Sequence, residues 1–351
     1  MARILILGGT RFLGRHIAEQ ALAAGHQLTL LHRGRSQAGL FPQAEHLIAD
    51  RDHDLSALHG RTWDVVIDTS AYVPRQVRQL ATALGGLAGR VGQYQLVSTI
   101  SVYDRFDALG TGEDAPLRHL DDPAAETIDG STYGGLKALC EAQAEAGFGA
   151  RCLISRPGLL IGPHDPTGRF SWWLQRLLRG GEVLAPGDPQ APVQFIDARD
   201  VAAWMLLQAE RGTRGVFNLN GPDRPLTMGR MLDTLRQELN PGATLTWVDE
   251  PFLLARQVAP WTELPVWLPS ASQDMHRIST ARAQAHGLSC RPLAQTVADT
   301  AAWLRAASSC APGSSDGQSD GPPRPAVGMR PERETALLQA WRTLGEPRTG
   351  R

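Results

Sequence analysis

The amino-acid sequence predicts an α/β fold, in which a doubly wound parallel sheet is joined to a smaller, mixed α/β cap towards the C-terminus. Short, almost continuously apolar runs alternate with helical segments through the first half, which is typical of a parallel sheet covered by helices on both faces. A glycine-rich turn from Gly8 to Gly14 joins the first apolar run to the first helical segment. The chain has 351 residues, 42% of them hydrophobic, which is enough for two domains.

The strands expected in the main sheet are short runs in which apolar residues dominate. They lie at residues 3–7, 27–31, 46–49, 64–68, 94–98 and 152–155. The first helix is expected from Gly14 to Ala24. After Pro157 the composition shifts to Gly, Pro and Trp. A short strand over 193–196 and a helix over 199–209 are then expected to return to the main sheet.

The nucleotide-binding domain and the cap are each expected to be discontinuous. We place them at residues 1–157 with about 193–215, and at residues 158–192 with 216–307. Residues 308–328 are rich in Ser, Gly and Pro, and they bury too little apolar surface to order themselves, so a disordered linker is expected. A last helix within 329–351 begins near Pro331 and ends at Gly345. Its apolar face is expected to dock on its own subunit or on a partner; the residues of this face are Leu337, Leu338, Trp341 and Leu344.

Charge and cysteine usage argue against several classes of protein. The formal net charge of −1 offers no basic field for a nucleic-acid backbone or an anionic membrane. No stretch approaches the roughly 20 apolar residues of a membrane span, and the N-terminal apolar run is too short for a signal peptide. We expect a cytoplasmic protein with no metal, no nucleic-acid partner and reduced thiols. The cysteines, Cys140, Cys152, Cys290 and Cys310, show neither disulfide nor metal-ligand spacing.

The glycine turn has the position of a Rossmann dinucleotide-binding turn, because it follows a strand and opens a helix. Glycine permits the sharp bend and the close approach of the backbone, and the free N–H groups of the helix N-terminus face the pyrophosphate. Arg11 stands where the usual pattern has a glycine, and its guanidinium is expected to contact phosphate. The residues expected to bind the cofactor here are Gly8, Thr10, Arg11, Phe12, Leu13 and Gly14.

The end of the second strand indicates which cofactor is used. NAD-specific sites place an Asp or Glu there to hold the ribose 2′-hydroxyl. This chain has no carboxylate in the stretch His32 to Ser36, and Arg33 is suited to a 2′-phosphate in forked geometry. NADP(H) is therefore favoured over NAD(H), which stays possible. The alternative interpretation of Arg33 is a solvated basic loop.

The candidate catalytic residues are Thr99, Tyr133 and Lys137. Tyr133 and Lys137 are spaced i, i+4 and share one face of a helix. A phenol has a pKa of about 10, and a fixed ammonium nearby favours its ionised form and makes it an acid–base catalyst near neutrality. Thr99 follows a strand end, where a hydroxyl is suited to hold the substrate oxygen, and Lys137 is also expected to bond the nicotinamide ribose. The alternative is that all three are ordinary helix and strand-end residues.

Together these motifs resemble the extended short-chain dehydrogenase/reductase family, which contains the NAD-dependent epimerases and dehydratases. The resemblance covers the chain to about residue 306. The segments that carry it are 8–14, 98–103, 133–137, 156–163 and 195–201. It implies that Asp50 and Arg51 meet the adenine, and that Pro157 approaches the nicotinamide. It also implies that Thr69, Ser70 and Ala71 line the cofactor. The unusual first turn is similar to that of a branch containing chloroplast stem-loop RNA-binding proteins, which generally lack the Tyr/Lys pair.

Departures from the family pattern narrow the reaction. Family dehydratases carry Asp-Glu after the catalytic Thr, where this chain has Ile100 and Ser101, so water elimination is excluded. Sugar-nucleotide epimerases usually carry Asn and Arg where this chain has Leu159 and Val193. We therefore expect a reductase or dehydrogenase acting on a carbonyl or alcohol of a small molecule. A homodimer is the assembly considered for this chain. The alternatives are an NAD-dependent epimerase and a non-catalytic nucleotide- or RNA-binding relative.

The loop and helix start between residues 162 and 173 are expected to cap the pocket. Trp172 and Trp173 suggest flat apolar walls, and Arg169 is suited to an anionic group. Tryptophans at such positions also pack domains together, and His164 fits an exposed loop. None of these four residues is therefore predicted to be catalytic.

Overall fold

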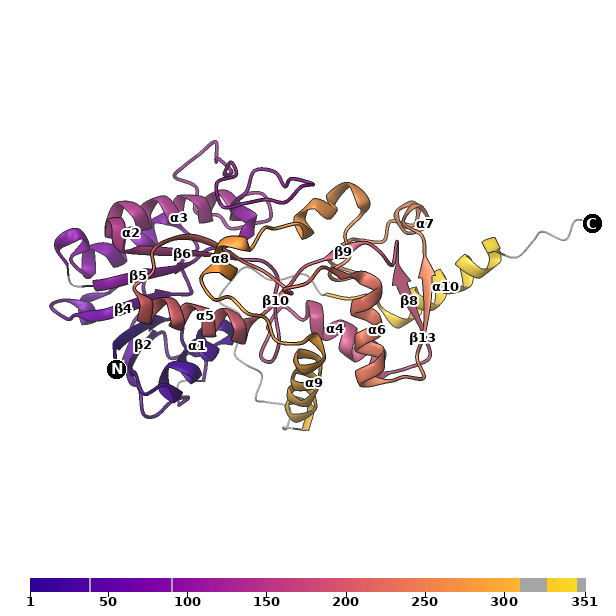
Figure 1. Cartoon of the computed structure of the whole chain (residues 1–351), viewed down its shortest axis with the longest axis horizontal. Helices are drawn as coiled ribbons and strands as arrows, with labels where there is room; N and C mark the ends of the chain where they lie inside the picture. Colours follow the sequence, from indigo (N-terminus) through magenta and orange to yellow (C-terminus); the bar gives the residue numbers. More distant parts are fainter. Residues whose placement is uncertain (38, 90, 310–326, 346–351) are drawn as a thin grey trace, which may run out of the picture.

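The structure is a computed structural model, which describes residues 1–37, 39–89, 91–309 and 327–345. Its main element is a seven-stranded sheet within these residues (Figure 1). The strands are β1 (Arg3–Leu7), β2 (Gln27–His32), β3 (Glu45–Ile48), β4 (Trp63–Asp68), β5 (Val91–Val97), β6 (Cys152–Pro157) and β11 (Gly215–Leu219). Their order in space is β11-β6-β5-β4-β1-β2-β3, and every neighbouring pair is parallel. The predicted doubly wound sheet is confirmed. The strand order reverses between β1 and β4, and such a switch point opens a ligand crevice at the carboxyl ends of the strands.

Helices cover both faces of this sheet. α1 (Phe12–Ala23) and α5 (Ala198–Arg211) lie on one face, and α2 (Pro74–Ala83) and α3 (Tyr133–Phe148) lie on the other. Because successive side chains of a strand point to opposite faces, β1 contributes to both cores. Ile4 and Ile6 pack with the α1/α5 layer, whereas Leu5 and Leu7 pack with the α2/α3 layer. This double burial explains why the strands read as continuous apolar runs.

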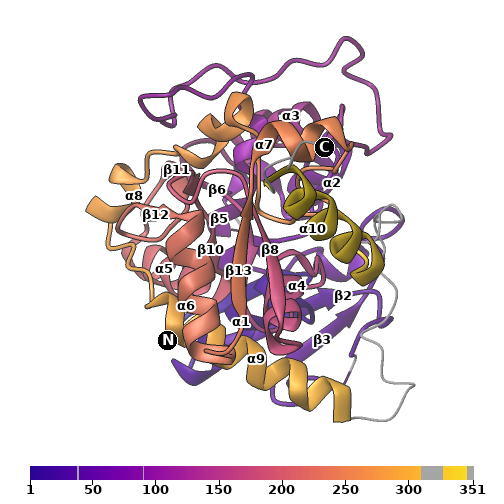
Figure 2. The same cartoon turned by 90° about the vertical axis from the view of Figure 1, so that its right-hand side faces the viewer.

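The cap packs around its own core beside the carboxyl edge of the sheet (Figures 1 and 2). Its core contains Phe170, Trp173 and Leu232, all fully buried. The helices around this core are α4 (Arg169–Leu178), α6 (Met228–Leu239), α7 (Glu250–Ala255), α9 (Leu293–Ser309) and α10 (Pro331–Gly345). The short helix α8 (Ala281–Ala285) packs instead against β11 of the main sheet. The short strands are β7 (Leu160–Ile161), β8 (Glu182–Pro186), β9 (Pro192–Val193), β10 (Ile196–Asp197), β12 (Leu226–Thr227) and β13 (Thr244–Val248). No helix of the described residues is long and apolar enough to cross a membrane.

The prediction that residues 193–196 form a strand of the main sheet is wrong. This segment is split into β9 and β10, which pair with β12 and β7 and not with the main sheet. Between them, the Gln194 N–H donates to the His276 ring and the Phe195 N–H to the Gly221 carbonyl, so the backbone turns away from a strand ladder. The seventh strand of the main sheet is β11, so residues 216–219, which were predicted to start the second part of the cap, belong to the sheet.

The C-terminal helix docks on its own cap. Leu337 and Leu338 are buried in the cap core, and the Trp341 ring lies 5.0 Å from the Phe252 ring. Of the two alternatives drawn from its apolar face, the structure shows the intramolecular one. The predicted linker is shorter at its start, because α9 continues to Ser309. Residues 310–326 of that predicted linker lie outside the described residues.

Candidate dinucleotide and catalytic site

The glycine turn is shaped by two close backbone approaches. Gly8 has φ of +88°, and a Cβ there would lie 2.7 Å from Thr69 Oγ1. A Cβ on Gly14 would lie 2.2 Å from the Gly8 carbonyl oxygen, so only glycine lets α1 start this close to the turn. The N-cap residue is Arg11, whose side chain cannot accept a hydrogen bond, which leaves the first N–H groups of α1 to a ligand or water. These features fit a dinucleotide pyrophosphate at the helix N-terminus.

The carboxyl end of β4 continues the crevice from this turn. The Thr69 hydroxyl donates to the Leu7 carbonyl at 2.8 Å and fixes the chain beside β1. Arg51 is tied to the buried Asp68 by two hydrogen bonds of 2.7 and 2.8 Å, and it also donates to Ser70 Oγ. Although burial raises the pKa of Asp68, the Arg51 guanidinium holds it below its ordinary value. Arg51 therefore stabilises the end of β4 and the residues that follow it. Its contact with adenine stays a prediction.

A histidine pair organises the loop that carries Arg33. The Gly34 N–H donates to His32 Nδ1 at 3.1 Å, so the proton of the neutral ring is on Nε2. That proton is donated to His46 Nδ1 at 2.8 Å, and His46 Nε2 in turn donates to the Phe41 carbonyl at 3.0 Å. Burial and the neighbouring His46 lower the pKa of His32. The position that holds a carboxylate in NAD-specific sites is thus filled by a neutral imidazole, and Arg33 directly follows it.

Tyr133, the candidate catalytic tyrosine, begins α3, and a turn at Asp129 fixes this start. The Asp129 carboxylate accepts from the Ser131 and Thr132 N–H groups at 2.8 and 3.0 Å. These hydrogen bonds, with those from the Ser131 and Thr132 hydroxyls, lower the pKa of Asp129 to about 2. The Tyr133 N–H donates to the Asp129 carbonyl at 3.0 Å. Asp129 therefore determines where Tyr133 enters the helix.

The turn that carries Thr99 packs against the same end of α3. Thr99 follows β5 and accepts a hydrogen bond from the Ser101 N–H at 3.1 Å. A Cβ on Gly134 would lie 2.1 Å from the Ser101 carbonyl oxygen, so the first turn of α3 presses on this segment. The structure thus brings the elements carrying Thr99, Tyr133 and Lys137 together at the carboxyl edge of the sheet, as the sequence predicted. Their catalytic roles stay predictions.

Lys137 is buried between the ends of β4 and β5. Its Nζ donates to the Ala71 and Val97 carbonyls, each at 2.7 Å, and the side chain is 3% exposed. Burial lowers the pKa of this ammonium. The half-exposed ring of Tyr72 lies 6.0 Å from Nζ. With the described residues Nζ makes two hydrogen bonds and has three donors, which leaves one for a ribose hydroxyl or the tyrosine phenol.

A buried ion pair, which was not predicted from the sequence, stabilises the inner face of α3. Glu141 lies four residues beyond Lys137 and, like Arg156, is 3% exposed. Arg156 Nη2 donates to Glu141 Oε2 at 2.6 Å, and Nη1 donates to the Tyr103 hydroxyl at 3.1 Å. The Ser98 hydroxyl also donates to Glu141. A carboxylate on the inner face of the Tyr/Lys helix was the available signal, because glutamate is rarely buried without a partner.

A series of contacts, here called the cap wall, runs through the cap from the edge of the sheet. A Cβ on Gly158, next to Pro157, would lie 2.6 Å from the Asn220 amide. Asn220 donates to the Gln194 side chain at 3.1 Å, and the Gln194 N–H donates to His276 at 3.0 Å. The His276 and Trp261 rings lie 6.1 Å apart. The Arg169 guanidinium lies 5.6 Å from the centre of the Trp261 ring. This wall also escaped the sequence analysis, because its members come from four distant segments.

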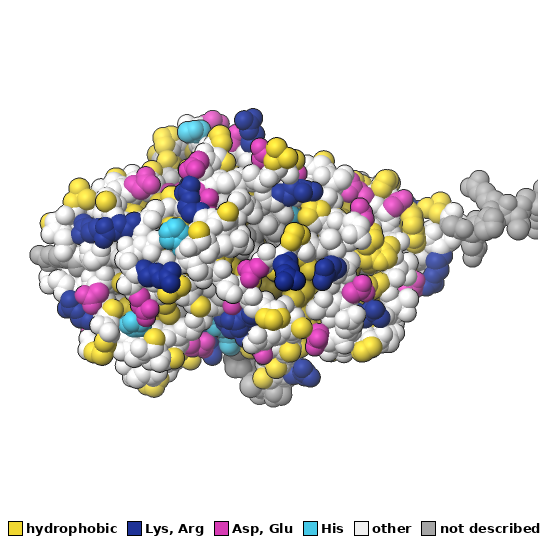
Figure 3. Space-filling view, in the orientation of Figure 1, with side chains coloured by type: hydrophobic (Ala, Val, Ile, Leu, Met, Phe, Trp, Pro, Cys, Tyr) yellow, Lys and Arg dark blue, Asp and Glu magenta, His cyan; other side chains and the backbone are white. Residues whose placement is uncertain are grey.

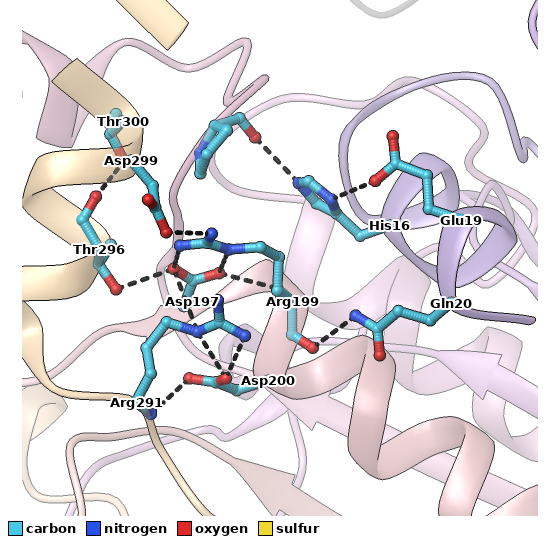
Figure 4. Close-up of polar contacts among 11 residues, drawn as sticks. His16, Glu19, Gln20, Asp197, Arg199, Asp200, Arg291, Thr296, Asp299 and Thr300 are labelled. Atoms are coloured by element: carbon cyan, nitrogen blue, oxygen red, sulfur yellow. Dashed lines mark hydrogen bonds and ion pairs between the residues drawn. The ribbon is translucent and has the colours of Figure 1, made fainter. Parts of the chain in front are cut away.

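A second polar network joins the nucleotide-binding domain to the cap (Figure 4). On α1, His16 bonds both Glu19 and the Pro163 carbonyl at 3.1 Å. At the start of α5, Asp197 pairs with Arg199 at 2.7 Å and accepts from Thr296 of α9 at 2.8 Å. The arrangement anchors the loop after β7 and the helix α9 to the first domain, so the cap is held over the crevice. His164 belongs to this junction, with its ring 5.8 Å from that of His16.

The parallel sheet, its glycine turn and the cap define a Rossmann-fold protein of the dinucleotide-binding class. Residues 4–219 match the NAD dependent epimerase/dehydratase family, and this match covers more than half of the chain. The protein therefore belongs to that family. The resemblance drawn from the sequence motifs is confirmed.

Three relatives illustrate the similarity. A chloroplast stem-loop binding protein of 41 kDa (b) from Arabidopsis thaliana is 28% identical over 237 residues, which cover 62% of this chain and 58% of that protein. The match thus spans less than two thirds of the Arabidopsis protein. Phenylcoumaran benzylic ether reductase PT1 from Pinus taeda is 23% identical, covering 66% of this chain and 68% of the relative. UDP-glucuronic acid 4-epimerase from Bacillus cereus, solved with NAD, shares the fold with a TM-score of 0.63 at 16% identity, covering 87% of this chain and 99% of that one.

Proposed function

We propose that the protein is an NADP(H)-dependent oxidoreductase that interconverts a carbonyl and an alcohol on a small molecule. Lys137 carries this proposal. It is the sole lysine of the sequence, in which lysine and arginine together number 35. The chain uses arginine at every other basic position and keeps an ammonium at the base of this crevice. An ammonium is compact and shifts its pKa readily, whereas a guanidinium is forked and permanently charged.

The residues divide the chemistry as follows. The Thr99 hydroxyl holds the substrate oxygen, and Tyr133 gives its phenolic proton to that oxygen in the direction of reduction. Lys137 stabilises the phenolate left behind, because a cation within reach favours the charged form of the phenol. The glycine turn and the α1 N-terminus hold the pyrophosphate, and Arg33 holds the 2′-phosphate. When bound, the nicotinamide supplies or accepts the hydride.

The preference for NADP(H) is supported by the neutral His32 at the end of β2 and by Arg33 after it. A reductase is also supported by the Pinus taeda relative, which is named as one. We further propose a cytoplasmic location, because the buried Cys140 and Cys152 are free thiols. We also propose a homodimer, on the sole ground that dimers are common in this family.

The test measures oxidation of NADPH with para-nitrobenzaldehyde as a carbonyl probe. General acid–base groups contribute about 10²–10⁴-fold, so Tyr133→Phe is expected to lower kcat/KM by at least about 100-fold. The affinity for NADP⁺ should stay within about threefold, because the phenol does not hold the cofactor. Lys137→Arg should also be inactive although it keeps the charge. Glu145→Gln, exposed on the same helix, is the control and should behave as wild type.

The two alternatives give different results. An epimerase of this family would release tightly bound NAD when the purified protein is denatured, and it would show no net oxidation of NADPH. An RNA-binding relative would bind RNA with a steep dependence on salt. The surface argues against the RNA-binding alternative, because Arg side chains are interspersed with Asp and Glu on the face drawn in Figure 3. Full activity in Tyr133→Phe would refute the proposed mechanism.

A further inference from the structure

The C-terminal helix places a buried carboxylate in the cap. Glu334 of α10 is 4% exposed. It accepts from Arg176 Nε at 2.8 and 2.6 Å and from the Leu184 N–H of β8 at 3.0 Å. A carboxylate is seldom buried unless its charge is paired, and here three donor contacts converge on one group. The helix α10 is therefore bound to the cap by a specific polar contact as well as by its apolar face.

Arg176 connects Glu334 to α4. It lies in the last turn of that helix, and it also donates to the Gly180 carbonyl at 3.0 Å and to the Glu182 carbonyl. One guanidinium thus joins the end of α4, the start of β8 and α10. In the described part of the chain, Glu334 is the one carboxylate that pairs with Arg176.

The stretch before α10 reaches the opposite end of α4. The Gly328 N–H donates to the Thr262 carbonyl at 2.7 Å. Gly328 has φ of +99°, and a Cβ there would lie 1.9 Å from Trp172 Cδ1 in the first turn of α4. Gly328 thus contacts two segments that carry residues of the cap wall. One is the start of α4, which carries Arg169, and the other is the loop that carries Trp261.

We infer that residues 327–345 set the shape of the substrate pocket, with Gly328 and Glu334 as positioning residues for the Arg169–Trp261 wall. The contacts form an unbroken path from Glu334 through Arg176 along α4, and from Gly328 to Trp172 and Thr262. This segment lies beyond the family match, which ends at residue 219. The part of the inference that concerns substrate rests on the proposed function. The contacts of Gly328 and Glu334 given above reach α4, β8 and the Thr262 carbonyl, so we expect the segment to act on substrate fit and not on the chemical step.

Hydrogen–deuterium exchange of the full chain tests the structural part without any substrate. Glu334→Gln keeps the shape of the side chain and removes its charge, and Glu332→Gln, exposed on the same helix, is the matched control. The amides of α4 are expected to exchange at least about tenfold faster in Glu334→Gln, whereas α1 to α3 should keep their protection. Gly328→Ala leaves the ion pair intact and displaces Trp172. It should loosen the first turn of α4 and residues 261–262, with Thr335→Ala as its control.

Kinetics test the pocket. With para-nitrobenzaldehyde, both variants should raise KM at least about fivefold and leave kcat within about twofold, because only substrate binding is weakened. Affinity for NADP⁺ should not change. The inference is overturned if α4 exchanges in both variants as it does in the controls. It is also overturned if exchange rises uniformly over the chain while KM stays constant, which indicates general stabilisation only. If the wild-type protein turns over no carbonyl, the proposed function fails, and the exchange result alone decides the inference.

Discussion

Removing the Glu141 carboxylate is expected to destabilise the protein strongly, because it leaves a buried guanidinium without its counter-ion. In the structure Arg156 Nε lies 3.0 Å from Glu141 Oε1 and Nη2 lies 2.6 Å from Oε2. Burial lowers the pKa of Arg156, and Glu141 more than restores it, so that the pKa lies above its ordinary value. Breaking a buried pair by truncating one partner costs about 3–5 kcal/mol. Glu141→Ala should therefore remove that much from the free energy of unfolding.

The measurement is urea unfolding followed by circular dichroism, with Glu145→Ala in parallel. Glu145 is exposed one turn further along α3, so its truncation should change the free energy of unfolding by no more than about 0.5 kcal/mol. A total stability of about 5–15 kcal/mol makes the two outcomes easy to separate. The double variant Glu141→Leu/Arg156→Met should recover most of the loss, because neither charge then stays buried alone.

Glu141→Ala should also lose activity, because Glu141 holds the inner face of the helix that presents Tyr133 and Lys137. The double variant separates the two effects: it should be stable and yet show reduced turnover, since the hydrogen bonds that align α3 with Ser98 and Tyr103 are gone. The reasoning is refuted if Glu141→Ala unfolds at the same urea concentration as Glu145→Ala. It is also refuted if the double variant is no more stable than the single one.

Three further predictions test other parts of the site. Gly14→Ala should abolish dinucleotide binding, measured by calorimetry, and lower the free energy of unfolding by more than about 2 kcal/mol. The reason is that its Cβ would lie 2.2 Å from the Gly8 carbonyl oxygen. Gly39→Ala, whose Cβ meets nothing within 4 Å, is the control. Arg33→Ser should weaken NADPH binding about 10–100-fold, the worth of a charge-assisted hydrogen bond, and leave NADH binding unchanged; equal losses for both cofactors would contradict the assignment. Burial lowers the pKa of His276 from 6.5 to about 4, so the unfolded chain binds the extra proton first and stability should fall by up to about 3 kcal/mol between pH 6.5 and 4; His276→Asn should flatten that part of the stability profile, and an unchanged slope would count against it.

The main sheet was predictable because its strands are buried on both faces. A run such as residues 3–7 is apolar throughout, since Ile4 and Leu5 enter different cores, and no other local structure explains such a run beside a glycine turn. The i, i+4 spacing of Tyr133 and Lys137 predicted that they share a helix, and both lie in α3. Residues 193–196 misled it, because their apolar alternation is satisfied by packing into the cap and not by a place in the main sheet.

The supporting residues could not be predicted, because each depends on a partner far away in the chain. Arg51 was assigned to the cofactor by resemblance, yet its partner Asp68 lies 17 residues further on and takes up both of its terminal nitrogens. Glu334 finds Arg176 across 158 residues. Such pairs leave no periodic pattern. The sole lysine was a sequence signal of another kind, which a search for motifs passes over, because it concerns what the rest of the chain lacks.

The two departures at Leu159 and Val193 gain a physical meaning from the cap. Val193 lies in β9, is 1% exposed and packs in the cap core, and Leu159 packs against the same core. These side chains are part of the wall's interior, so replacing either by a polar residue would bury an unpaired group and not merely add a contact. Beside them, the amide of Gln194 is already shared between Asn220 and Ile278. Next to the sheet edge, these apolar side chains and the Gln194 amide thus contact other residues of the cap. A substrate held there by shape and by one reacting oxygen suits such a wall better than a nucleoside diphosphate, and this supports the reductase over the sugar-nucleotide epimerase.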